Sequence, residues 1–181
     1  MVTWSSGGAL AALGVIALDP ASPAIDLVRE DRDAPPGPSI ELGMKTLYTA
    51  TATAHGGREG HVQSDDGFLE ADLRLPKSMG GPGGEGTNPE QLFAAGYAAC
   101  FESALRLVAR TQKKKLTDAH VTARVSLNAT DDGKYILAVE LEGRLEGVEK
   151  DEAQALMDAA HQVCPYSNAT RGNVEVKVTA A

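Results

Sequence analysis

Two cysteines, Cys100 and Cys164, are the residues of this sequence best suited to redox chemistry. They are the only cysteines among 181 residues, too few for the disulfide framework of a small secreted domain. Each lies in an apolar segment with helical spacing and could simply pack in a core. Alternatively, one thiol could attack an oxidant and the other could then attack the oxidised sulfur. Their separation in the sequence does not establish that they meet.

Neither cysteine position supplies the charge that a reactive thiol requires. The nucleophile is the thiolate, whose usual pKa is about 8.5 and rises when the thiol is buried. Cys100 is expected in the middle of a helix, far from the helix N-terminus, and Cys164 at a helix C-terminus, where the dipole opposes a thiolate. A reactive Cys100 therefore needs a cation from elsewhere in the protein, whereas Cys164 suits the second, slower thiol.

The two cysteine-bearing segments are predicted to be helices over residues 88–112 and 149–164. Asn88 is a typical N-cap, Pro89 suits the first helical position, and Gln91 stands in capping-box register. The first helix is apolar nearly all round, which predicts burial on several sides. Because one small domain offers little room for such a helix, a dimer interface is a natural second partner.

Alternating apolar and polar residues predict five or six strands around these helices. The alternation occurs in residues 46–54, 69–75, 121–127, 135–141 and 174–178, with hairpin signals at Asp65-Asp66-Gly67 and Asp132-Gly133. The resulting order is β-β-β-α-β-β-α-β, with mainly antiparallel pairing. The predicted fold class is therefore α+β.

The chain is expected to form one domain, residues 44–181, preceded by a flexible Pro-rich extension, residues 1–43. Five of the nine prolines fall between residues 19 and 38, and residues 1–43 contain six acidic and two basic residues, as is common in linkers. Met44 is a candidate natural start. The apolar run of residues 9–18 is shorter than the roughly 20 residues of a membrane helix, so no membrane segment and a cytoplasmic location are expected.

Composition and motifs disfavour several other classes. The formal charge is −8 and aromatic residues make up 4%, which disfavours nucleic-acid binding. The glycine run at 81–86 is interpreted as a tight loop, because it lacks the βαβ context of a dinucleotide site. The run Lys113-Lys114-Lys115 suits a helix C-terminus. Neither paired C-x-x-C nor H-x-x-x-H spacing is present, so no metal or cofactor is expected.

Two longer motifs give the sequence a family resemblance. They are GTNPEQLFAAGYAACF at residues 86–101 and CPYSNATRGNV at residues 164–174. Together they resemble the two cysteine motifs of the organic hydroperoxide resistance (Ohr) family, over about residues 44–181. The glycine run before Thr87 and the Tyr-Ser-Asn after Cys164 favour Ohr over the sister OsmC group.

The resemblance implies an OsmC/Ohr-like fold, an intertwined homodimer with antiparallel sheet on central helices, and a cofactor-free peroxidase. Cys100 would become a sulfenic acid and then form a disulfide with Cys164, which a lipoylated protein or dihydrolipoamide would reduce. Arg58 matches the family's thiolate-stabilising arginine, and Glu90 matches the carboxylate that orients it. The substrate would be an alkyl or fatty acid hydroperoxide.

Two expectations follow from the residues themselves. Glu90 and Cys100 are ten residues apart on one helix, or about 15 Å, so Arg58 or Glu90 is expected to reach Cys100 across the dimer interface. Candidate lining of an apolar substrate funnel comprises Phe93, Tyr97, Phe101 and Met79, with ordinary core packing as the alternative for each.

Alternative functions remain open at this point. They are an OsmC-type peroxidase of broader specificity, a metal-binding module, and a non-enzymatic redox sensor or apolar ligand carrier. Zinc content would identify the metal module, and turnover with a dithiol would separate catalysis from sensing.

Overall fold

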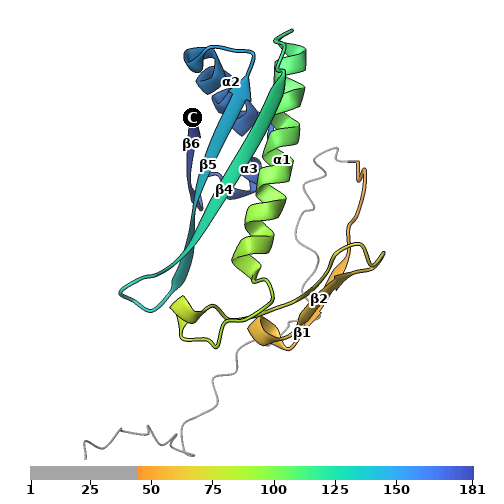
Figure 1. Ribbon diagram of the computed structural model, residues 1–181, viewed down its shortest axis with the longest axis vertical. Helices are drawn as coiled ribbons and strands as arrows, with labels where there is room; N and C mark the ends of the chain where they lie inside the picture. The colour runs from red at the N-terminus through yellow and green to blue at the C-terminus, as the bar shows by residue number, and fades with distance from the viewer. Residues whose placement is uncertain (1–44) are drawn as a thin grey trace, which may run out of the picture. The chain divides into compact units, whose positions relative to one another are not determined.

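The computed structural model describes residues 45–181, of which residues 47–181 form one structural unit. The expected extension, residues 1–43, lies outside the described residues. The elements are β1 (Ala52–His55), β2 (His61–Ser64), β3 (Glu70–Asp72), α1 (Pro89–Thr111), β4 (Asp118–Ala129), β5 (Tyr135–Glu146), α2 (Lys150–Val163), α3 (Pro165–Thr170) and β6 (Glu175–Ala180) (Figure 1). This order confirms the predicted α+β class and adds one short helix, α3.

Two three-stranded sheets divide the strands. The first has the order β1-β2-β3 and is antiparallel throughout. The second has the order β4-β5-β6, where β4 and β5 form a long antiparallel hairpin and β6 pairs with β5 in parallel. The predicted Asp132-Gly133 turn closes this hairpin, and Gly133 has the positive φ of 82° that the turn requires. The expected strand over residues 46–54 is shorter than predicted, because regular pairing begins only at Ala52.

Helix α1 begins where the sequence predicts. The side chain of Asn88 accepts a hydrogen bond from the Gln91 backbone N–H at 2.9 Å, and Pro89 opens the helix. Its C-terminus is a Schellman motif, in which Lys114 N–H bonds to the Ala109 carbonyl and Lys113 N–H to the Arg110 carbonyl. Lys113 has φ 56°, which makes it the only described residue other than glycine with positive φ.

Lys113 therefore occupies a position that glycine normally fills. We expect Lys113→Gly to be more stable than Lys113→Ala by about 1 kcal/mol, because only alanine retains a Cβ in the left-handed conformation. Both variants lose the same charge, so the comparison isolates the backbone effect. Urea unfolding measures the difference. At Lys115, where φ is not positive, glycine should be no better than alanine, and a glycine advantage there would contradict the assignment.

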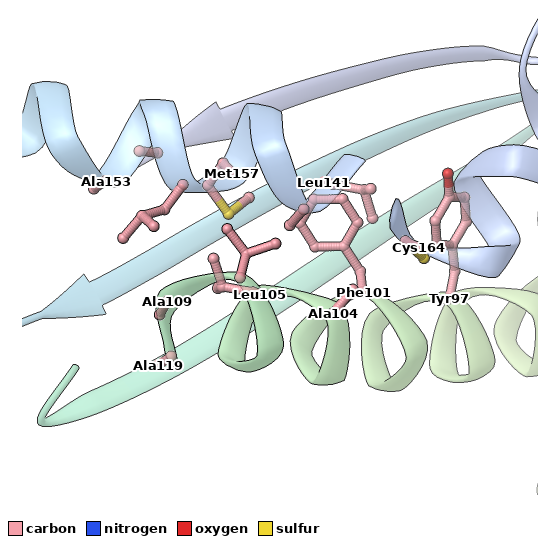
Figure 2. Close-up of a cluster of buried hydrophobic side chains, with 14 of the residues drawn as sticks. Tyr97, Phe101, Ala104, Leu105, Ala109, Ala119, Leu141, Ala153, Met157 and Cys164 are labelled. Atoms are coloured by element: carbon pink, nitrogen blue, oxygen red, sulfur yellow. The ribbon is translucent and has the colours of Figure 1, made fainter. Parts of the chain in front are cut away.

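The core lies between α1, α2 and the face of the β4-β5-β6 sheet. α1 contacts β4, α2 and α3, while α2 contacts β5 and β6 (Figure 1). Buried side chains from these elements form one cluster, which includes Cys164 (Figure 2). The cluster comprises Tyr97, Phe101, Ala104, Leu105, Val108, Ala109, Ala119, Val139, Leu141, Ala153, Leu156, Met157, Ala160, Cys164 and Ala180.

Among residues 45–181, the β1-β2-β3 sheet has no comparable core. None of its residues is buried, and all four residues of β1 are exposed. Phe68, in the turn between β2 and β3, is 94% exposed, and Leu47 and Tyr48 are also exposed. Isolated small sheets are marginally stable in water unless a hydrophobic face is covered. The described residues therefore leave this sheet without the cover that such a sheet needs.

Part of helix α1 is also uncovered. The residues that one chain buries lie on one side of the helix, whereas Leu107 remains 48% exposed. By length and composition alone α1 could cross a membrane. Its packing against β4, α2 and α3 instead makes it the core helix of this fold.

Candidate active site

The fold brings the two cysteine thiols into contact. The Sγ atoms of Cys100 and Cys164 are 3.5 Å apart, although the residues are 64 positions apart in the chain. Both are free cysteines. Cys100 is partly exposed, whereas Cys164 is 0% exposed and belongs to the core. A disulfide has an S–S length near 2.05 Å, so the sulfurs need to approach by only about 1.5 Å. The pair can exchange between dithiol and disulfide with little movement.

Each cysteine is held by a different element. Cys100 lies in the middle of α1, as predicted. Cys164 lies at a junction, because it caps the C-terminus of α2 and the N-terminus of α3. The sequence correctly predicts that Pro165 ends α2, since proline lacks the N–H that the helix would need. It also opens α3, because proline suits the first helical position.

The short helix α3 also changes the electrostatic expectation for Cys100. Burial raises the pKa of the Cys100 thiol, and the backbone N–H of Tyr166 acts against this by interacting with the sulfur. Cys100 lies far from the N-terminus of its own helix, as expected, and this backbone N–H comes from a second element, α3. Burial remains the larger effect, so within one chain the Cys100 pKa lies above its usual value. A thiolate at neutral pH still requires a cation.

Arg58 and Glu90 form a second pair. The guanidinium donates two hydrogen bonds to the carboxylate, with Nη1 to Oε2 at 2.8 Å and Nη2 to Oε1 at 2.6 Å. This bidentate contact lowers the pKa of Glu90 and raises that of Arg58. Arg58 lies in a 3-10 turn between β1 and β2, and Glu90 lies in the first turn of α1. The side chains are 35% and 15% exposed.

Within one subunit, this ion pair does not join the cysteine pair. The groups that affect the Cys100 pKa are its own burial, Tyr166 and Cys164, and neither Arg58 nor Glu90 is among them. A single chain thus carries two separate pairs of functional side chains. One is the pair of thiols, and the other is a cation that a carboxylate orients.

The candidate lining residues have different environments. Tyr97 and Phe101 are both 0% exposed and pack in the core, so they do not line an open funnel in the subunit. Phe93 is partly buried and its ring stands edge-on to that of Tyr97, with centroids 5.8 Å apart. Met79 borders a cavity of about 380 Å³ that Glu90 also lines, together with apolar side chains of α1 and β4.

Sequence reasoning missed a buried polar network beside the thiols. Tyr97 Oη donates to Ser167 Oγ at 3.0 Å and lies 3.1 Å from Thr170 Oγ1. Ser167 Oγ also lies 2.9 Å from His161 Nδ1. Ser167 and Thr170 are the buried polar residues of the described chain. Their i, i+3 spacing after Pro165 was the available signal, because it places both hydroxyls on one face of a helix.

In the part of the chain that the structure describes, no group of three or more His, Cys, Asp or Glu side chains is arranged to hold a metal ion. The two thiols are thus close to each other but not to a set of further ligands. Their arrangement suits thiol-disulfide chemistry.

Known proteins are similar to this chain in sequence and in fold. A family model described as OsmC-like protein matches residues 81–179. An organic hydroperoxide resistance protein of Xanthomonas axonopodis pv. citri (strain 306) is 53% identical over 138 residues, covering 76% of this chain and 96% of the relative. The organic hydroperoxide resistance protein OhrB of Bacillus subtilis (strain 168) is 49% identical over 133 residues, covering 73% and 96%.

A solved structure of an organic hydroperoxide resistance protein has a similar fold. The crystal structure of an organic hydroperoxide resistance protein from Legionella pneumophila has a TM-score of 0.72 and 56% sequence identity. The similarity covers 76% of this chain and 99% of that chain.

Proposed function

Because this chain belongs to the organic hydroperoxide resistance proteins of the OsmC-like family, we propose that it reduces organic hydroperoxides to alcohols with Cys100 and Cys164. Membership gives it a hydroperoxide-detoxifying redox role in the oxidative stress response. The observation that carries the specific mechanism is the 3.5 Å contact between a partly exposed and a fully buried sulfur.

Cys100 is the sulfur that meets the peroxide. Its thiolate attacks the terminal oxygen of R–O–O–H, so that an S–O bond forms as the O–O bond breaks. The alkoxide takes up a proton and leaves as the alcohol, and Cys100 becomes a sulfenic acid. The partial exposure of Cys100 supports this role, because a peroxide can reach its sulfur but not the buried sulfur of Cys164.

Cys164 then resolves the sulfenic acid. Its sulfur attacks the Cys100 sulfur from behind as the S–O bond breaks, and the hydroxyl leaves with the thiol proton as water. The 3.5 Å separation of the two sulfurs supports this displacement. The resulting disulfide protects Cys100 from further oxidation.

An external dithiol completes the cycle, and the family resemblance suggests dihydrolipoamide or a lipoylated protein. Its first thiolate attacks the Cys100 sulfur, since Cys164 has no exposed surface, and Cys164 leaves as the thiolate. The second thiol of the reductant then displaces Cys100 and closes the reductant's own disulfide. Two thiols that must be regenerated in this way suit a reducing compartment, so we place the protein in the cytoplasm.

The active form is proposed to be a homodimer whose partner subunit supplies Arg58 and Glu90 to each cysteine pair. The uncovered β1-β2-β3 sheet and the exposed part of α1 support a partner that buries them. An arginine fixed by a bidentate carboxylate would stabilise both the thiolate and the charge that develops on the departing oxygen. It would lower the pKa that burial raises.

The substrate is proposed to carry an apolar tail. Each buried methylene contributes about 0.8 kcal/mol, so the second-order rate constant should rise roughly tenfold for every two methylenes that the site buries. Hydrogen peroxide has no tail and should react slowest. Of the four candidate lining residues, Met79 and the partly buried Phe93 remain compatible with this role, since Tyr97 and Phe101 are in the core.

Stopped-flow oxidation with hydrogen peroxide and with methyl, propyl and pentyl hydroperoxides tests this proposal. Intact-mass analysis should then show the Cys100-Cys164 disulfide, and dithiol reductants should sustain turnover. Oxidant-treated protein with two free thiols would overturn the peroxidase mechanism. A disulfide that forms once but gives no turnover with any dithiol would instead indicate a redox sensor.

A further inference from the structure

Behind the thiol pair, a buried polar network ties α3 to the two longer helices. Tyr97 belongs to α1, three residues before Cys100, and its hydroxyl meets both Ser167 and Thr170 of α3. Ser167 in turn meets His161 of α2. Tyr97, Ser167 and Thr170 are all buried, so these hydrogen bonds form where water does not compete for them.

The network is fully satisfied. Thr170 Oγ1 also lies 3.0 Å from the Tyr166 carbonyl oxygen, and none of the buried side-chain polar atoms of the described residues lacks a partner. Burial and the charge of Arg171 lower the pKa of His161, which favours the neutral ring. A neutral His161 can accept the Ser167 hydroxyl proton at Nδ1 while Ser167 accepts from Tyr97.

Helix α3 needs such support because it contains only six residues. An isolated helix of that length is unstable in water, so its place depends on tertiary contacts. Two groups that face Cys100 depend on the position of α3. They are the Cys164 sulfur at the N-cap of α3 and the Tyr166 N–H in its first turn.

We propose that Tyr97, Ser167 and Thr170 are positioning residues that hold α3 against α1, so that Cys164 stays within reach of the Cys100 sulfenic acid. The inference rests on the proposed peroxidase function. It gives Tyr97, for which the sequence leaves substrate lining and core packing both open, a role within the core. Displacement of a reacting group by about 1 Å can cost on the order of 100-fold in rate, so the network controls how fast the disulfide closes.

The rate of disulfide closure can be measured from the competition between disulfide formation and over-oxidation of Cys100. A sulfenic acid either reacts with Cys164 or is oxidised by a second peroxide to sulfinic acid. The peroxide concentration at which half of Cys100 becomes sulfinic acid therefore reports the closure rate. Because it compares two products of the same sulfenic acid, this value does not depend on how fast Cys100 reacts with the first peroxide, and it is measured on folded variants.

The test exposes wild type, Tyr97→Phe and Thr170→Val to an alkyl hydroperoxide without reductant and determines disulfide and sulfinic acid by intact mass. Both variants should reach half over-oxidation at a peroxide concentration about tenfold lower than wild type. Thr170→Ser, which keeps the hydroxyl, should restore the wild-type value. Tyr135→Phe is the matched control, because Tyr135 is 73% exposed at the start of β5, and it should behave as wild type.

Unchanged values in the folded variants would overturn the positioning role while leaving the peroxidase intact. If Tyr97→Phe does not fold, Thr170→Val and its Thr170→Ser rescue decide the matter alone. If wild type forms no disulfide at any peroxide concentration, the proposed function itself fails.

Discussion

Cys100→Ser is expected to abolish hydroperoxide consumption. A serine hydroxyl is not ionised at neutral pH and cannot accept the peroxide oxygen as sulfur does, and the remaining thiol, Cys164, is 0% exposed. The rate of consumption should fall at least about 1,000-fold, to the background rate of free solution. A coupled assay with excess dithiol and an alkyl hydroperoxide measures it.

Cys164→Ser provides the matched comparison at the other sulfur. It should consume about one equivalent of hydroperoxide per subunit in a rapid first phase, because Cys100 and its surroundings are retained. Turnover should then stop or slow sharply, with a sulfenic or sulfinic acid on Cys100 by mass. If Cys100→Ser retained turnover, or if Cys164→Ser lost the rapid phase while folded, the two roles would be assigned wrongly.

Arg58→Gln is expected to lower the second-order rate constant for peroxide reduction by about 100-fold at neutral pH. Burial raises the pKa of the Cys100 thiol, and removal of the guanidinium leaves little to oppose that rise. Only the Cys100 thiolate reacts with the peroxide. When the pKa of Cys100 is higher, a higher pH is needed to reach the same rate. Part of the loss should therefore be recovered at high pH. A pH profile of stopped-flow rates measures both effects.

Mixing provides the control for the cross-subunit arrangement. Arg58→Gln disables the ion pair and Cys100→Ser disables the thiol pair. If the arginine comes from the partner, a mixed dimer therefore retains one site that has both an intact thiol pair and an intact arginine. Random mixing of equal amounts makes half of the dimers mixed, and about a quarter of wild-type activity should return. Lys134→Gln, which removes a cation paired with Asp132 in the exposed β4-β5 turn, should leave the rate unchanged. No recovery on mixing would place Arg58 and Cys100 in the same subunit's site.

The helices could be predicted from the sequence because their ends are encoded locally. Asn88 and Pro89 fix the start of α1, and the apolar stripe that ends at Cys164 defines α2, so both helices agree with prediction to within one residue. The β4-β5 hairpin was equally accessible through its alternation and its Asp132-Gly133 turn. These features depend on neighbouring residues rather than on tertiary contacts.

What the sequence did not reveal depends on contacts between distant segments. Helix α3 is too short for hydrophobic periodicity to detect, and its hydroxyls matter because of Tyr97, 70 positions away from Ser167. For Tyr97 the sequence leaves substrate lining and core packing both open. Its burial and its hydroxyl contacts are known only once α1 and α3 are placed together.

The β1-β2-β3 sheet, which lacks a core of its own, has a consequence for the life of the polypeptide. In the proposed homodimer its folding would be coupled to assembly, so mass action would make the free energy of unfolding rise with protein concentration. At low abundance, newly synthesised chains would present open strand edges, which are prone to join the wrong neighbour. If the proposed dimer supplies Arg58 across the interface, encounter with a second copy would protect these edges and complete the active site at the same time.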